Sequence, residues 1–107
     1  MNKLLSICIP TRNRAKMLRG CLDVLVPQAA RKRVPIYVSD EASTDETQYV
    51  LDQYRQIYDL FFVQTHKQSL GIDDGNWITS VRMAKSKFVW SFSDDDLIEE
   101  GLSLIHI

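Results

Sequence analysis

The sequence predicts an α/β protein in which a mainly parallel sheet lies between layers of helix. Short apolar runs alternate with stretches whose apolar residues recur every three or four positions. The apolar runs have the length and composition of strands buried on both faces, as in parallel sheets. The chain has 107 residues, 45% of them hydrophobic, which suffices for one core. We therefore expect one domain over residues 1–107.

The first half of the chain predicts two strands and the helix between them. Residues 4–9 form an apolar run that ends at Pro10, and they are predicted as the first strand. A helix is expected from Ala15, with its apolar face spaced at three and four residues, and it is expected to stop before Pro27. Residues 35–39 are predicted as the second strand.

The second half continues the alternation. Ser43 and Glu46 have capping-box spacing, so a helix is expected to begin there, and residues 60–63 are predicted as the third strand. Residues 71–75 read as a loop whose aspartates could cap a helix that carries Trp77 and Ala84. Residues 88–92 are predicted as the fourth strand.

Three adjacent carboxylates, Asp94, Asp95 and Asp96, follow the fourth strand. On spacing alone, a solvated turn explains them equally well. Their position favours a site, because ligands bind at the carboxyl ends of strands in open α/β sheets. Carboxylates this close repel each other unless a proton or cation intervenes, and Mg²⁺ or Mn²⁺ would serve.

Two further loops are expected at the same sheet edge. Asp40 ends the second strand and could accept a hydrogen bond from a base or a ribose; the alternative is a turn aspartate. The loop Pro10-Thr11-Arg12-Asn13-Arg14 follows the first strand, and taken by itself it favours a strand-to-helix turn with a polar cap over a binding site. The sequence has no glycine-rich phosphate fingerprint, so metal and side chains would hold any phosphates.

The segments Ile9 to Arg14, Val38 to Asp45 and Ser93 to Asp96 together resemble family 2 glycosyltransferases over residues 4–104. Gly75-Asn76-Trp77 and Phe88-Val89-Trp90 are similar to the family's helix and strand before its DXD motif. The resemblance implies a GT-A fold, a Rossmann-like α/β/α sandwich, here truncated after the fourth strand. It also implies sugar transfer from a nucleotide diphosphate sugar, expected to be UDP-linked, to a glycan or lipid acceptor in polysaccharide or cell-envelope biosynthesis.

The resemblance also implies residue roles. Pro10 and Thr11 would line the base, Asp40 would contact a uracil-type ring, and Arg12, Asn13, Arg14, Glu41 and Asn76 would complete the nucleotide-sugar site. Of Asp94, Asp95 and Asp96, one would lie near the ribose and others would hold the metal. A literal DXD uses Asp94 and Asp96; the usual family pattern uses Asp95 as the metal ligand, with Asp94 nearer the ribose.

Two departures from the family pattern stand out. Glu41 and Ala42 occupy positions where many members have Asp and Gly, which suggests a different donor preference. The family's catalytic base and acceptor region follow the DXD motif by a long distance, so both are expected beyond Ile107. We therefore expect the 107-residue chain to bind donor weakly without turnover.

Composition limits the other partners. Thirteen basic and fourteen acidic residues give no field that would attract nucleic acid. Cys8 and Cys21 have no metal-type spacing and are expected in the core. No apolar stretch reaches the roughly 20 residues of a membrane span. We expect a cytoplasmic location, or the inner face of the membrane for the full-length protein.

Two alternatives remain open at this point. A nucleotidyltransferase would also place metal-binding aspartates at a sheet edge, but it would need a glycine-rich loop after the first strand, and no glycine follows until Gly20. A receiver-like Mg²⁺-binding interaction domain would carry paired acids where Pro10-Thr11 stands.

Overall fold

The computed structural model describes residues 4–67 and 75–91, and for residues 75–78 it describes the backbone alone. Along the chain these residues form β1 (Leu5–Thr11), α1 (Ala15–Lys32), β2 (Ile36–Glu41), α2 (Thr47–Ile57), β3 (Phe61–His66), α3 (Gly75–Arg82) and β4 (Phe88–Ser91). The strands make one parallel sheet in the order β3-β2-β1-β4. This confirms the predicted α/β class.

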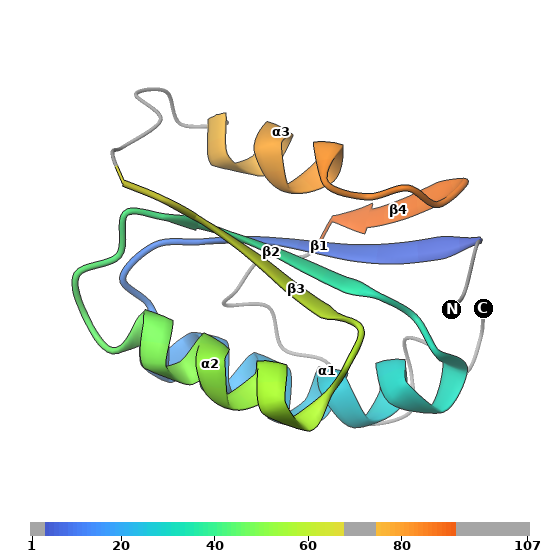
Figure 1. Cartoon of the computed structure of the whole chain (residues 1–107), viewed down its shortest axis with the longest axis horizontal. Helices are drawn as coiled ribbons and strands as arrows, with labels where there is room; N and C mark the ends of the chain where they lie inside the picture. The colour runs from blue at the N-terminus through green and yellow to red at the C-terminus, as the bar shows by residue number, and fades with distance from the viewer. Residues whose placement is uncertain (1–3, 68–74, 92–107) are drawn as a thin grey trace.

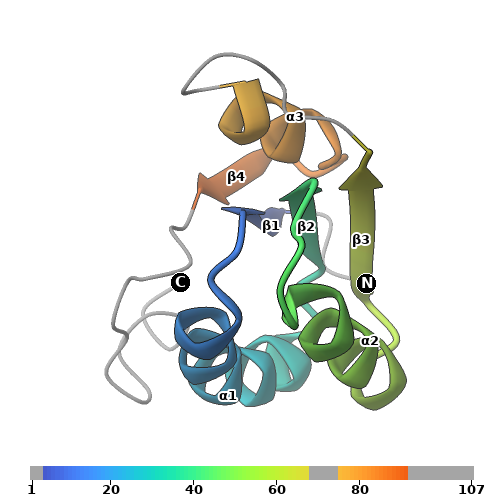
Figure 2. The same ribbon diagram turned by 90° about the vertical axis from the view of Figure 1, so that its left-hand side faces the viewer.

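The helices cover both faces of the sheet, with α1 and α2 on one side and α3 on the other (Figures 1 and 2). The strand order explains this division. From β1 to β3 the chain moves one way across the sheet, and from β3 to β4 it moves back past β1. Since crossover connections are almost always right-handed, the reversal places α3 on the opposite face.

The hydrophobic core lies between the sheet and the α1–α2 layer. Alternate strand residues face this layer, and the helices present apolar stripes at helical spacing. Its fully buried members include Ile7, Ile9, Leu18, Leu22, Leu25, Ile36, Val38, Val50 and Leu51. Cys8 and Cys21 are both buried and free, as expected, and burial raises the pKa of the Cys8 thiol to about 11.

The first strand runs to Thr11, beyond the predicted end at Ile9, and so includes Pro10. Ile7 donates its N–H to the carbonyl of Pro35 beside β2. Because successive residues of a strand direct their N–H groups to opposite sides, the nitrogen of Pro10 faces β4 instead. The described pairing of β1 with β4 ends at Cys8. The missing N–H of Pro10 therefore falls where no described ladder bond would need it.

The first helix continues through Pro27 to Lys32, so the prediction that it stops before Pro27 was wrong. Pro27 is exposed, whereas Val26 and Ala29 are buried against the sheet. Burial of Val26, Gln28 and Ala29 around the proline offsets the penalty of a helical proline, about 3 kcal/mol. Arg33, in left-handed conformation, ends the helix by donating its N–H to carbonyls of the last turn.

The predicted capping box was also wrong. The second helix begins at Thr47, and its N-cap residue Glu46 makes no capping bond with its side chain. Asp45 instead accepts from the Thr47 N–H at 3.0 Å. Ser43 is directed toward Asp40 and Asn13, so its hydroxyl serves the loop rather than the helix.

The remaining boundaries differ modestly from the predictions. The second strand extends from Ile36 to Glu41, and the third extends from Phe61 to His66, past the predicted end at Val63. The third helix ends at Arg82, short of Ala84. The fourth strand is described to Ser91, and the loop aspartates before α3 lie outside the described residues.

Candidate functional site

The carboxyl ends of β1 and β2 lie side by side at one edge of the sheet. Thr11, the last residue of β1, is the register partner of Asp40 in β2. The sheet order reverses between β1 and β4, with α1 on one face and α3 on the other. In open α/β sheets, ligands bind in the crevice at such a switch point, outside the carboxyl ends of the strands. The topology therefore makes this edge the candidate ligand site.

Asp40 faces the α1–α2 side of the sheet and has no exposed surface. One carboxyl oxygen accepts a hydrogen bond from the Ser43 hydroxyl, and the other has no partner among the described residues. Burial raises the pKa of the carboxyl above its ordinary value, although the Ser43 hydrogen bonds act in the opposite direction. Asp40 thus holds the loop after β2 through its hydrogen bond with Ser43, on the α1–α2 side of the sheet.

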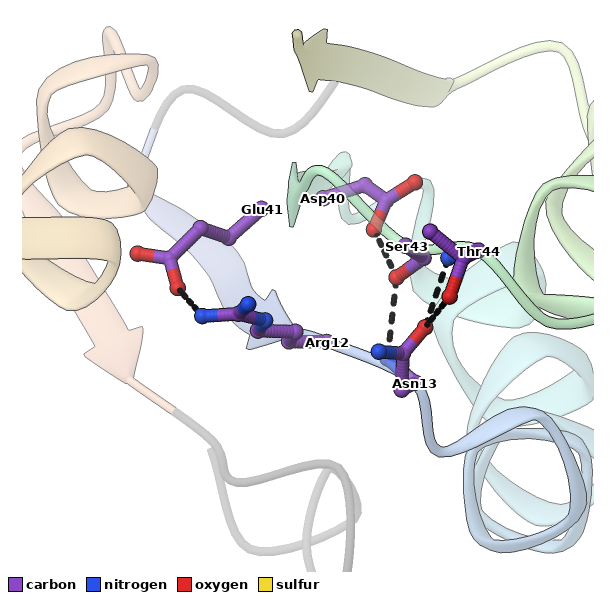
Figure 3. Close-up of polar contacts among 6 residues, drawn as sticks. All are labelled: Arg12, Asn13, Asp40, Glu41, Ser43 and Thr44. Atoms are coloured by element: carbon purple, nitrogen blue, oxygen red, sulfur yellow. Dashed lines mark hydrogen bonds and ion pairs between the residues drawn. The ribbon is translucent and has the colours of Figure 1, made fainter. Parts of the chain in front are cut away.

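Glu41 faces the other side of the sheet, toward α3, and pairs with Arg12 (Figure 3). Arg12 Nη1 donates to Glu41 Oε2 at 3.1 Å. The Glu41 side chain is 11% exposed and the Arg12 side chain 51% exposed, so the pair reaches from the strand end to solvent. A carboxylate and a guanidinium held together here can accept a hydrogen bond from a base or hydroxyl and donate to an anion.

The remaining residues of the first loop differ in exposure. Thr11 is buried, Pro10 is half-buried, and Asn13 and Arg14 are exposed. Asn13 adopts a left-handed conformation with φ of 51°, and Arg14 is the N-cap residue of α1. Asn76 lies in the first turn of α3, where side chains are not described. The structure thus brings the residues from 10 to 14 together with Asp40 and Glu41.

His66 is a neighbour of the site that the sequence did not reveal. The strand predicted to end at residue 63 continues to His66, which is the last residue of β3 and the register partner of Glu41. Its Nε2 and the Ser39 hydroxyl lie 2.9 Å apart in a hydrogen bond. The sequence of this strand does not alternate, because three apolar residues are followed by Gln64, Thr65 and His66, and the polar run concealed the end of the strand.

The acidic run Asp94, Asp95 and Asp96 lies outside the described residues. Within residues 4–67 and 75–91, no three histidine, cysteine or acidic side chains are grouped to hold a metal ion. The strand before the acidic run is described: β4 is parallel to β1, and Ser91 pairs with Cys8. Both strands therefore run toward the same edge.

A separate hollow of about 480 Å³ opens between the first turns of α1 and α2. Lys16 and Arg19 line it from one helix, and Asp45 and Glu46 from the start of the other. It lies on the α1–α2 side of the sheet, whereas the Arg12–Glu41 pair lies on the α3 side. It is thus distinct from the edge described above.

Comparison with known proteins identifies the family. The model of glycosyl transferase family 2 matches residues 6–104. This chain belongs to that family. The match decides against the receiver-like and nucleotidyltransferase alternatives, and it covers all the segments that carried the resemblance.

Two curated relatives are enzymes of this kind. The chain is 34% identical to the abequosyltransferase RfbV of Salmonella typhimurium over 105 residues, which cover 95% of this chain and 31% of RfbV. It is 30% identical to the poly(ribitol-phosphate) beta-glucosyltransferase of Bacillus spizizenii, covering 88% of this chain and 15% of that protein. The chain thus spans less than a third of either relative.

Among solved structures, the chain resembles the mannosyltransferase PcManGT of Pyrobaculum calidifontis, determined in complex with GDP-Man and Mn²⁺. The TM-score is 0.73 at 23% identity, over 85% of this chain and 27% of the other. The expected GT-A fold is thereby confirmed. No helix in the described part of the chain is long and apolar enough to cross a membrane.

Proposed function

We propose that this chain is the donor-binding half of a glycosyltransferase that moves a sugar from a nucleotide diphosphate sugar to a glycan or lipid acceptor in cell-envelope polysaccharide synthesis. The observation that carries the proposal is the convergence of the β1 and β2 loops, with the Arg12–Glu41 pair, at the switch-point edge. The two curated relatives, one an abequosyltransferase, support this class of reaction.

The geometry suggests a division of labour for the nucleotide. Pro10 and Thr11 form the wall at the end of β1, where a base can pack. Glu41, with its carboxylate at the α3 side, is placed to accept an N–H of the base or a ribose hydroxyl, and Arg12 screens its charge. Asp40, expected from the resemblance to touch the ring, is fully buried and supports this surface instead.

Arg14 and Asn76 approach the same edge from the start of α1 and of α3. We propose that they complete the donor site on its two flanks. A guanidinium suits the diphosphate, and a carboxamide suits sugar or ribose hydroxyls. In the register of the usual family pattern, Asp94 would lie nearer the ribose and Asp95 would be the metal ligand.

For the metal, we propose that carboxylates of Asp94, Asp95 and Asp96 hold Mg²⁺ or Mn²⁺. Asp94 follows Ser91 by three positions, and three steps of extended chain span at most about 11 Å, so the acidic run begins within reach of the carboxyl edge. A divalent cation there would neutralise charge on the departing diphosphate. The Mn²⁺ bound by the mannosyltransferase of similar fold supports this choice.

We propose that acceptor binding and the catalytic base belong to a part of the enzyme outside this chain. The chain covers only 31% of its abequosyltransferase relative. We place the reaction in the cytoplasm, or at the inner face of the membrane for the whole protein. The two free, buried cysteines fit a reducing compartment.

Calorimetry with UDP, CDP and GDP, each with and without Mn²⁺, tests the proposed function. We expect metal-dependent binding of at least one nucleoside diphosphate. Glu41→Gln should weaken it about ten-fold, as loss of one charge-assisted hydrogen bond predicts. Asp59→Asn is the matched control, since it removes an exposed arginine–carboxylate pair at the other end of the sheet. Absence of metal-dependent heat with all three nucleotides would contradict donor binding.

A further inference from the structure

Asn13 is joined by hydrogen bonds to the loop that follows β2 (Figure 3). Its backbone N–H donates to the Ser43 hydroxyl at 2.9 Å. Its side-chain oxygen accepts from the backbone N–H of Thr44 at 2.6 Å and of Asp45 at 3.3 Å. The Thr44 hydroxyl approaches the same oxygen at 3.4 Å. A carboxamide oxygen has two lone pairs, so these two N–H groups occupy both.

The same network continues to the sheet. Ser43 donates its hydroxyl hydrogen to Asp40, which is fully buried in β2. Ala42 turns the chain back with φ of 51°, and Asn13 also adopts a left-handed conformation. Asparagine tolerates this conformation better than most residues, because its short polar side chain bonds locally. We name the residues Asn13, Asp40, Ser43 and Thr44 the loop clamp.

The loop clamp lies directly beside the ion pair of the proposed site. Arg12 precedes Asn13, and Glu41 follows Asp40. The clamp joins the two loops on the α1–α2 side, while Arg12 and Glu41 meet on the α3 side. Because the clamp fixes the two loops to each other, it also fixes the distance between the Arg12 guanidinium and the Glu41 carboxylate before any ligand binds.

We propose that Asn13 is a positioning residue, which preorganises Arg12 and Glu41 for the nucleotide through the loop clamp and does not contact the ligand itself. This inference rests on the proposed function. It departs from the expectation that Asn13 belongs to the donor contacts. Preorganised groups bind more tightly because the cost of ordering them is met during folding.

Two substitutions at position 13 separate positioning from contact. Asn13→Asp keeps an acceptor oxygen and tolerates the left-handed conformation, whereas Asn13→Gly tolerates the conformation without the acceptor. We expect UDP affinity with Mn²⁺ to change less than three-fold in Asn13→Asp and to fall about ten-fold in Asn13→Gly. A direct contact predicts the reverse order, since an added carboxylate beside a diphosphate would repel it.

Stability and hydrogen exchange complete the test. Tyr58→Phe removes hydrogen bonds to Val34 and Ala29 at the opposite end of the sheet, and it should lower Tm without altering nucleotide affinity. Amide protection at Thr44 and Asp45 should fall in Asn13→Gly and persist in Asn13→Asp. Weaker binding by Asn13→Asp than by Asn13→Gly would overturn the inference, as would unchanged binding by Asn13→Gly. If the unaltered chain binds no nucleotide, the proposed function itself fails and this inference falls with it.

Discussion

At the scale of single residues, adjacent positions of one strand have opposite roles. Asp40 and Glu41 are both carboxylates, but alternation turns Asp40 into the molecule and Glu41 toward α3. The sequence predicted that both lie at the sheet edge, but it could not tell which of them faces α3, because that depends on which face each helix covers. The position of His66 was also not predicted, because β3 continues for three polar residues beyond its apolar run.

The burial of Asp40 predicts a pH dependence of stability. Because burial raises its pKa above the ordinary value of 3.8, the folded chain retains a proton that the unfolded chain releases. The stabilising contribution is complete below the unfolded pKa and is lost as pH rises through the folded pKa. We expect the free energy of unfolding of the natural chain, relative to Asp40→Asn, to decrease from about pH 3.5 to about pH 7. Urea unfolding at both pH values measures it, and a constant difference would count against the buried carboxyl.

At the scale of elements, packing overrode local sequence signals twice. The proline that should end α1 lies on its exposed side, and the helix continues because its other side is buried. The Ser43–Glu46 spacing, typical of a helix cap, belongs instead to a loop held by Asn13, thirty positions earlier. Neither result could be predicted from local pattern, because both depend on partners distant in sequence.

Pro27→Ala should stabilise the chain. Alanine restores the helical N–H and removes the ring, which predicts a gain of about 1–3 kcal/mol in the free energy of unfolding. Gly20→Ala is a control for propensity alone, because nothing lies within 4 Å of an added Cβ there. It should gain about 0.5–1 kcal/mol. Chemical denaturation measures both, and a loss of stability in Pro27→Ala would show that the proline suits the helix at this point.

At the scale of the whole molecule, the α/β alternation in the sequence was enough to predict the class and the resemblance to predict the family. The order β3-β2-β1-β4 could not be predicted from the sequence, because strand pairing joins residues far apart in the chain. That order creates the reversal beside β1, which is the position at which open α/β sheets bind ligands. The acidic run is the part of the site whose placement stays a prediction.

We propose that the β1 loop, the β2 loop and the acidic run share one metal-nucleotide site. Nuclear magnetic resonance of the chain with UDP tests this directly, with Mg²⁺ replaced by paramagnetic Mn²⁺. We predict that Mn²⁺ broadens the amide signals of Thr11, Arg12 and Glu41 together with those of residues 94–96, and leaves Val34 and Asp59 at the amino edge sharp. Broadening confined to residues 94–96, with Thr11, Arg12 and Glu41 unaffected, would contradict it.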